Sequence, residues 1–219
     1  YNQRGVLFEV ETPFGNENIR LDIPGRFSVY NALCAIGICQ ATGIGISDIA
    51  KALVLAKGVK GRAEVVNIPT DYTVMIDYAH TPDGLENIIK TVKGFAKGRV
   101  ITVFGCGGDR DAAKRPKMGK IAGELSDFCV VTSDNPRTEN PQLIIDDILK
   151  GMTEFKEKYT AICDRTEAIE YAMRFAKAND VIILAGKGHE TYQILKDKTI
   201  HYDEREIVRD ILAKINSEA

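Results

Sequence analysis

The stretch RVITVFGCGGDRD, residues 99–111, sets a short and almost wholly apolar run directly before a loop of glycines and charged residues. Its first six residues are typical of a strand buried on both faces of a sheet. The same order returns in DFCVVTSDNPRTE at 127–139 and in DVIILAGKGHE at 180–190. Three apolar runs that each end in a polar loop indicate a sheet whose strands point the same way.

Amphipathic helical patterns separate these runs. The expected strands are 63–68, 72–77, 99–104, 127–132, 159–163 and 180–185, and the expected helices are 82–96, 115–126, 141–152, 166–178 and 203–216. The last two helices each place apolar residues on one face: Ile169, Ala172, Met173 and Ala176, then Ile207, Val208, Ile211, Leu212 and Ile215. This alternation predicts an α/β fold, a Rossmann-like and mostly parallel sheet with helices on both faces.

Residues 1–61 follow a different pattern. The expected elements are strands at 5–12 and 18–23, a turn at 13–16, and helices at 26–42 and 48–57, the second capped by Ser47. A hairpin with two helices buries little apolar surface by itself. We therefore interpret 1–61 as the end of a domain that begins upstream and 62–219 as a complete domain.

Composition limits the classes of partner. The chain has 219 residues, 29 of them basic and 31 acidic, for a net charge of −2. This balance gives no electrostatic reason to expect nucleic acid or an anionic membrane as the main partner. The sequence also lacks a signal peptide and any unbroken apolar run of about 18 residues.

The five cysteines show no spacing typical of a zinc site. Cys129 and Cys163 lie in apolar, strand-like runs, so we expect both to be buried thiols in a reducing cytoplasm.

Polar loops after the strands are the first candidates for a binding site. In an open α/β sheet, ligands bind outside the carboxyl ends of the strands, so the loops at 105–111, 133–139 and 186–190 should open on one edge. They offer Arg110, Arg137 and Lys187 beside Asp134 and Glu190. Clustered charges of both signs suit a zwitterion better than a bare phosphate.

Each loop taken alone has a plainer interpretation. The glycine-rich loop fits a tight turn, and it matches neither the dinucleotide fingerprint, because Arg110 replaces the third glycine, nor the P-loop pattern. Asp134, Asn135 and Pro136 can form a helix cap and turn, and His189 can be a turn or core histidine. The functional interpretation depends on the three loops converging.

A second polar set lies earlier in the chain. Asp77-Tyr78-Ala79-His80-Thr81-Pro82 ends a strand and begins a helix, where Thr81 is an adequate cap. A cap does not explain Asp77 and His80 together. Arg62, just after Gly61, can also be interpreted as a solvated charge in a linker.

Five motifs together resemble the Mur ligases, the ATP-dependent amino-acid ligases of peptidoglycan synthesis. They are Gly61-Arg62-Ala63-Glu64, Asp77-Tyr78-Ala79-His80-Thr81-Pro82-Asp83, the loop Gly105–Arg110, Asp134-Asn135-Pro136-Arg137 and Gly186-Lys187-Gly188-His189-Glu190. The similarity covers essentially the whole chain. It is greatest to the members that add meso-diaminopimelate to UDP-MurNAc-L-Ala-D-Glu through an acyl phosphate.

The resemblance implies that this chain contains parts of two domains of a longer protein. Residues 1–61 resemble the end of the family's central ATP-binding domain, and 62–219 resemble its C-terminal, amino-acid-binding domain. The family's P-loop, carbamylated lysine and magnesium ligands have no counterpart here, so we assign no catalytic residue and no metal ligand. We expect ATP and Mg²⁺ as cofactors and expect this polypeptide alone not to complete the reaction.

The resemblance also implies roles for particular residues. The positions that match the family's diaminopimelate site are Arg110, Asp134, Asn135, Pro136, Arg137, Gly186 and Glu190, and those that match its ATP contacts are Asn31, Arg62 and Asp77. Arginine binds a carboxylate bidentately, and a glutamate accepts hydrogen bonds from an ammonium group. Lysine, which lacks the distal carboxylate of diaminopimelate, would leave Arg137 without a partner, a loss of about 1.5–3 kcal/mol.

The implied partners are UDP-MurNAc-dipeptide, meso-diaminopimelate and ATP, for a cytoplasmic monomer that serves cell-wall biogenesis, cell shape and cell division. Two alternatives stay open at this point. One is a related Mur or folylpolyglutamate ligase that adds another amino acid, with lanthionine as a further candidate for the pocket. The other is a non-catalytic module that only binds an amino acid.

Overall fold

The computed structural model describes residues 5–218. These residues form two compact units that divide between Val59 and Lys60. The sequence placed the boundary after Gly61, and the first four residues of that predicted domain lie outside the described part. Assignment of the two units to an ATP-binding and an amino-acid-binding domain stays a prediction.

The first unit is a hairpin packed on two helices. Its elements are β1 (Val6–Thr12), β2 (Gly15–Leu21), α1 (Arg26–Ala41) and α2 (Ile46–Leu55), and β1 and β2 pair antiparallel. Its core is small and includes Val10, Ile19, Ile36, Ile46 and Ile49. The predicted strands and helices are confirmed, with shifts of a few residues at their ends.

The predicted cap of the second helix is wrong. The helix starts at Ile46 with Gly45 as its N-cap. Ser47 therefore lies inside the first turn, and its hydroxyl donates to the Glu17 carboxylate at 2.9 Å. The sequence Gly45-Ile46-Ser47 before an apolar run is compatible with a helix start at either residue, and Ser47 is instead bonded to the hairpin.

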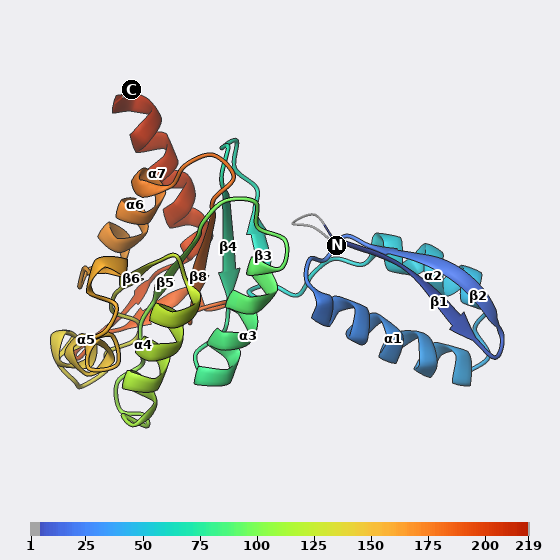
Figure 1. Ribbon diagram of the computed structural model, residues 1–219, viewed down its shortest axis with the longest axis horizontal. Coiled ribbons are helices and arrows are strands. Elements are labelled where there is room, and N and C mark those ends of the chain that lie inside the picture. The colour runs from blue at the N-terminus through green and yellow to red at the C-terminus, as the bar shows by residue number, and fades with distance from the viewer. Residues whose placement is uncertain (1–4, 219) are drawn as a thin grey trace. The chain divides into compact units, whose positions relative to one another are not determined.

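The second unit contains a six-stranded sheet in the order β3-β4-β8-β5-β6-β7 (Figure 1). Its strands are β3 (Glu64–Val66), β4 (Thr73–Asp77), β5 (Val100–Phe104), β6 (Phe128–Val131), β7 (Tyr159–Ala161) and β8 (Val181–Ala185). Only β3, at the edge, runs antiparallel, and it pairs with β4. The mostly parallel sheet predicted from the sequence is confirmed.

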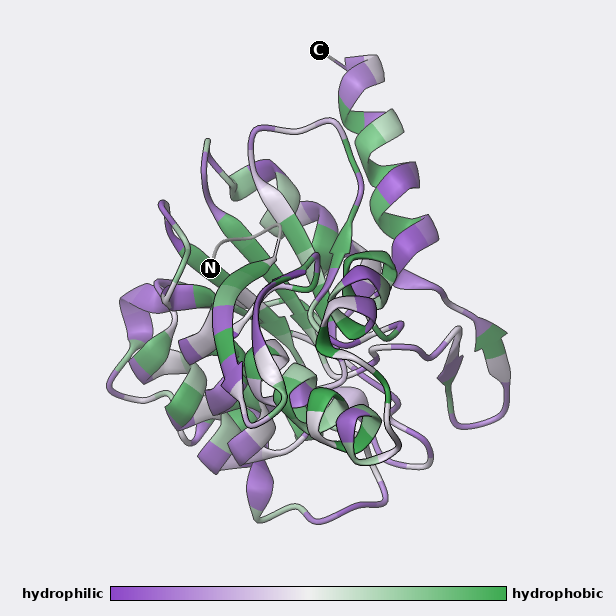
Figure 2. Ribbon diagram, turned by 90° about the vertical axis from the view of Figure 1, so that its right-hand side faces the viewer, coloured by the Kyte–Doolittle hydropathy of each residue, from purple (hydrophilic) through white to green (hydrophobic). Residues whose placement is uncertain are grey.

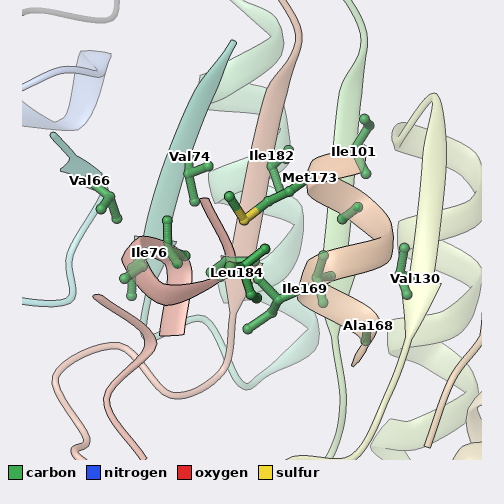
Figure 3. Packing of buried hydrophobic residues seen from close by; sticks show 14 residues of the cluster. Val66, Val74, Ile76, Ile101, Val130, Ala168, Ile169, Met173, Ile182 and Leu184 are labelled. Carbon is green, nitrogen blue, oxygen red and sulfur yellow. The ribbon is translucent and has the colours of Figure 1, made fainter. Parts of the chain in front are cut away.

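Helices cover both faces of this sheet. They are α3 (Pro82–Lys93), α4 (Lys114–Leu125), α5 (Pro141–Leu149), α6 (Arg165–Phe175) and α7 (Glu204–Glu218). α6 and α7 pack on one face, where Ile169 and Met173 point toward Ile182 and Leu184 of β8 (Figure 3). In Figure 2 the strands are mostly hydrophobic, whereas the helices carry alternating hydrophobic and hydrophilic bands, as amphipathic helices do.

The apolar faces predicted for the last two helices are confirmed. Ile169, Ala172 and Met173 are buried in the cluster shown in Figure 3, together with Val208 and Ile211 of α7. Within residues 5–218, every helix is too short or too polar to span a lipid bilayer.

Three short elements were not predicted. They are the hairpin strands β9 (Tyr192–Ile194) and β10 (Thr199–His201) and the 3-10 turn Lys156–Lys158. Each has only three residues, so none shows a period of hydrophobicity long enough to recognise.

One cysteine prediction is wrong. Cys129 is buried in β6, as expected, but Cys163 is exposed. β7 already ends at Ala161, so Cys163 belongs to the turn before α6 rather than to a buried strand. Its carbonyl oxygen accepts hydrogen bonds from the Thr132 hydroxyl and the Ser133 amide, which fixes the backbone but leaves the thiol outside.

A partly buried ion pair closes the amino ends of β5 and β8. The Arg99 guanidinium donates to the Asp180 carboxylate at 2.6 and 3.1 Å and to the Phe175 carbonyl at 3.0 Å. Burial by itself raises the pKa of the Asp180 carboxyl, but the hydrogen bonds from Arg99 and from the Lys177 amide lower that pKa below its ordinary value.

We predict that Arg99→Met lowers the free energy of unfolding by about 1–3 kcal/mol at pH 7, because it leaves a buried carboxylate without its guanidinium. The folded-state pKa of Asp180 is depressed, so the ionised group stabilises the fold above its unfolded pKa of about 3.9 and ceases to do so as the pH falls through the lower folded value. Urea denaturation of both proteins from pH 7 to pH 3 measures this. A stability difference that does not shrink in acid would contradict it.

Candidate functional site

Loops that follow four parallel strands enclose a cavity of about 470 Å³ at the carboxyl edge of the sheet. The loops follow β4, β5, β6 and β8, which is where an open α/β sheet binds ligands. The lining residues are Tyr78, His80, Thr81, Pro82, Gly107, Arg110, Asp111, Lys114, Lys117, Asp134, Asn135, Arg137, Gly186 and Glu190. The convergence of the three polar loops, on which the functional interpretation depends, is therefore present.

The cavity collects all but one of the residues predicted to hold the amino acid. The exception is Pro136, whose carbonyl oxygen would lie 2.0 Å from a Cβ at Gly108, so that Pro136 shapes the loop rather than the cavity wall. Lys187 also lies outside the lining, because its side chain is wholly buried beneath it. The role of each residue in binding stays a prediction.

The two loops that carry the arginines are joined by hydrogen bonds. The Gly108 amide donates to the Asn135 carbonyl at 2.9 Å. The Asp109 carboxylate accepts from the Thr138 hydroxyl at 2.7 Å and from its amide at 3.2 Å. These hydrogen bonds, the hydroxyl's first, lower the pKa of the Asp109 carboxyl. The loops therefore hold each other in register on one side of the cavity.

Arg137 has a strained backbone and an anchored side chain. Its φ of 52° lies in the left-handed region, which is unfavourable for a residue with a Cβ. Its Nη1 donates to the Gly108 carbonyl at 2.9 Å, and its amide donates to the Ile194 carbonyl at 3.1 Å. A Cβ at Gly107 would lie 2.8 Å from Nη1. The surrounding backbone therefore holds the guanidinium at the cavity wall before any ligand binds.

A support for these loops was missed by the sequence reasoning. Arg115, 3% exposed, donates to the Glu139 carboxylate at 2.8 and 2.9 Å and to Asp147 at 3.0 Å. Glu139 in turn accepts from the Asp109 amide. The hydrogen bond from Arg115, with that from Asp109, lowers the pKa of the Glu139 carboxyl. An arginine in the first turn of a helix does not by itself indicate a functional role. The link from Arg115 through Glu139 to the Asp109 loop is therefore visible only in the fold.

Carboxylates also line the cavity. Asp134 and Glu190 both line it, and Asp134 is only 7% exposed. Among residues 5–218, no group donates a hydrogen bond to the Asp134 carboxylate, whereas Glu190 accepts from the Asn135 amide at 2.9 Å. At Gly186, with φ of 118°, a Cβ would lie 2.5 Å from Asp134 Oδ2. Glycine there leaves room for the carboxylate.

A wholly buried arginine ties two of the site loops together from behind. The Arg165 guanidinium donates to the carbonyls of Ser133 at 3.3 Å and Ala185 at 3.0 Å, directly before the loops that carry Arg137 and Glu190. It also donates to the Glu204 carboxylate at 2.9 Å, and both side chains are at most 1% exposed. Arg165 therefore sets the spacing between the carboxyl ends of β6 and β8.

The first residues of the second unit contact the same rim. Gly61, with φ of 73°, lies so close to the loop after β8 that a Cβ there would be 2.1 Å from the His189 amide nitrogen. The Glu64 carboxylate accepts from the Gly61 amide at 2.6 Å and from Arg205 at 2.7 Å, and Arg205 also donates to the Gly188 carbonyl. The boundary segment and the Glu190 loop therefore form one connected structure.

The polar residues at 77–82 and Arg62 have different structural roles. Thr81 caps α3, as predicted, by accepting from the Gly84 amide. His80 and Tyr78 line the cavity, and the Tyr78 ring lies between His80 and His189 at centroid distances of 4.7 and 4.9 Å. The exposed Arg62 guanidinium stacks on the same ring at 5.0 Å.

The residues predicted to contact ATP lie outside the cavity lining. Asn31 is exposed on α1 of the first unit. Asp77 is buried and accepts from the Ala63 and Ala79 amides, each at 2.8 Å. Burial raises the pKa of the Asp77 carboxyl, although these two hydrogen bonds oppose that effect. Asp77 thus anchors the boundary segment, while its contact with ATP stays a prediction.

The charge pattern of the cavity suits a ligand with both signs of charge. Its lining includes the cationic side chains of Arg110, Lys114, Lys117 and Arg137 and the carboxylates of Asp111, Asp134 and Glu190. Among residues 5–218, no three His, Cys, Asp or Glu side chains gather closely enough to hold a metal ion.

Comparison with known families assigns this architecture. Residues 61–188 match the family described as "Mur ligase, glutamate ligase domain". The chain belongs to the Mur ligase family. Its similarity extends beyond the matched residues, because relatives of known name align with nearly all of it.

Two of those relatives share one name. The chain is 52% identical over 216 residues to the UDP-N-acetylmuramoyl-L-alanyl-D-glutamate–2,6-diaminopimelate ligase of Clostridium botulinum, which covers 98% of this chain and 44% of that protein. It is 54% identical over 210 residues to the ligase of the same name from Caldanaerobacter subterraneus, covering 96% and 43%. The chain thus spans less than half the length of these curated relatives.

Solved structures show the same Mur ligase fold. A structure with the same ligase name superposes with a TM-score of 0.74 at 32% identity and covers 99% of this chain and 44% of that one. MurF from Acinetobacter baumannii, at 18% identity, superposes with a TM-score of 0.70 over 97% of this chain and 43% of its own. At that identity, the second likeness supports the fold alone.

We predict that Arg165→Met lowers the free energy of unfolding by about 3–5 kcal/mol, because Glu204 would remain as an uncompensated buried charge. The double variant Arg165→Met with Glu204→Leu should be less destabilised than the sum of the two single variants, since it removes both charges. Chemical denaturation of the four proteins measures the coupling. Strictly additive losses would show that the two side chains do not act as a pair.

Proposed function

We propose that the protein containing this chain is an ATP-dependent ligase that adds meso-diaminopimelate to UDP-MurNAc-L-Ala-D-Glu in peptidoglycan synthesis. The names of its relatives support this proposal. Within it, the chain described here supplies the pocket for the diamino acid. The observation that carries the assignment is one cavity lined by charges of both signs: Arg110, Lys114, Lys117 and Arg137 together with Asp111, Asp134 and Glu190.

The shape of the ligand explains why both kinds of charge are needed. Diaminopimelate has an ammonium and a carboxylate at each end, and only one of its amines forms the new amide bond. Arg110 and Arg137 are placed to bind a carboxylate through their planar guanidinium groups. Asp134 and Glu190 are placed to accept hydrogen bonds from an ammonium group. Recognition of the distal end would leave the reacting amine directed out of the pocket.

The contribution of this chain to the reaction is positioning. Holding the amine nucleophile in one orientation removes much of the entropic cost of its attack on the activated carboxylate. ATP activates that carboxylate as an acyl phosphate in the complete protein. We propose that Asn31, Arg62 and Asp77 contribute to ATP binding there, and that Mg²⁺ is held by residues outside this chain. We therefore expect the 219-residue chain to bind the amino acid without catalysing its addition.

The same proposal places the protein in the cytoplasm as a monomer, with UDP-MurNAc-dipeptide, meso-diaminopimelate and ATP as partners. Its product serves cell-wall biogenesis, and through it cell shape and division. The domain assignment follows: residues 1–61 complete the ATP-binding domain and 62–219 form the amino-acid-binding domain.

We predict that meso-diaminopimelate binds this chain about tenfold to a hundredfold more tightly than L-lysine, because lysine lacks the carboxylate that pairs with Arg137. Arg137→Ala should remove most of this preference. Isothermal titration calorimetry, or NMR titration for weak binding, measures both ligands. Arg209→Ala, which truncates an exposed arginine on α7 outside the cavity, is the matched control.

Two results of that titration have different meanings. Equal affinity of wild type and Arg137→Ala for meso-diaminopimelate would remove Arg137 from the site. Tighter binding of lysine or lanthionine would retain the pocket and change the amino acid. In the complete ligase, Arg137→Ala should lose diaminopimelate addition and retain ATP binding.

A further inference from the structure

Lys187 is a charged side chain that the proposed site does not use directly. It is wholly buried beneath the cavity. Its Nζ lies 3.1 Å from Asn135 Oδ1 and 3.4 Å from Glu190 Oε2. Both partners line the cavity, so Lys187 contacts two binding groups from behind without lining the cavity itself.

The Asn135 side chain can adopt only one of its two amide orientations here. Oδ1 accepts from Lys187 Nζ and from the Ile194 amide, the latter at 3.0 Å, while Nδ2 donates to Glu190 Oε2 at 2.9 Å. Reversing the amide would set its NH₂ against two donors and its oxygen against a carboxylate. A buried polar group that loses its partners is strongly unfavourable, so the three contacts exclude the reversed form.

Charges of both signs and two aromatic rings surround Lys187. Burial lowers the pKa of Lys187, and the charges of Asp134, Glu190 and Glu204 oppose that effect, whereas Arg165 adds to it. Its ammonium also lies over the rings of Tyr192 at 6.0 Å and Tyr202 at 5.7 Å. A lysine so enclosed is costly for the fold, and its contacts are directed at the binding loop rather than at solvent.

We propose that Lys187 is a positioning residue, which fixes the Asn135 amide and the Glu190 carboxylate so that the cavity presents one donor beside one acceptor. This inference rests on the proposed function and deepens it. The consequence is selectivity at the distal end of the ligand: a carbon there that bears both an ammonium and a carboxylate matches the fixed pair, whereas the distal carbon of L-lysine bears an ammonium alone. Lys187 acts through its neighbours and does not itself touch the amino acid.

The test replaces Lys187 in the 219-residue chain. Lys187→Met removes the donor and the charge but keeps the length of the side chain, so Asn135 loses one of the three contacts that orient its amide. We expect the dissociation constant for meso-diaminopimelate to rise about tenfold or more. We also expect the preference over L-lysine to fall, because the fixed donor and acceptor pair is lost.

A control separates this effect from a simple loss of stability. Arg99→Met also removes a cation from a partly buried ion pair, but at the opposite end of the sheet. It should leave both dissociation constants unchanged. If Lys187→Met does not fold, Lys187→Gln, which keeps a hydrogen-bond donor and removes the charge, carries the same test with a smaller expected loss.

A second readout does not need the ligand. The side-chain amide of Asn135 should give a distinct, slowly exchanging pair of NMR signals in the wild type, because both ends of the amide are hydrogen-bonded. Those signals should shift and exchange faster in Lys187→Met, and remain unchanged in Arg99→Met. Signals and affinity unaltered by Lys187→Met would overturn the inference. A wild type that does not bind diaminopimelate but shows the expected NMR change would contradict the proposed function and retain the positioning role.

Discussion

The site depends on a guanidinium buried where two parallel strands end. Arg165 binds the carbonyls of Ala185, the last residue of β8, and Ser133, just after β6, and Glu204 balances its charge. Parallel strands leave such carbonyls at one edge of every α/β sheet. Because one arginine binds both carbonyls, the distance between the two loops that follow β6 and β8 is held constant. The functional side chains can then differ in charge while their separation is kept.

Charge is arranged in two layers at this edge. The outer layer, on the cavity wall, includes Arg110, Arg137, Asp134 and Glu190. The inner layer contains Lys187, Arg165 and Glu204, all at most 1% exposed. In the inner layer Arg165 pairs with Glu204, while Lys187 contacts Glu190 of the outer layer, whose groups remain available to a ligand. A pocket built in this way is formed before binding, so little ordering is left to oppose it.

Much of the fold and part of the site could be predicted from residue patterns. Apolar runs such as 180–185 and the apolar stripe of α6 led to the parallel sheet, and polar loops after three strands led to the cavity. The failures share a physical cause. Ser47, Cys163 and the three-residue strands β9 and β10 depend on contacts with distant segments, such as Ser47 with Glu17, which leave no local period in the sequence.

The sequence by itself determined which residues end each strand, because burial requires apolar runs and the polar residues can only follow them. It thereby determined that Arg110, Asn135, Arg137 and Glu190 would meet at one edge. Only the tertiary structure decided which of the charged residues face the cavity and which lie behind it. Lys187 and Glu190 stand three positions apart in one loop, yet one is wholly buried and the other lines the cavity. The Lys187 ammonium lies over the rings of Tyr192 in β9 and Tyr202 just before α7, a long-range arrangement that no local pattern encodes.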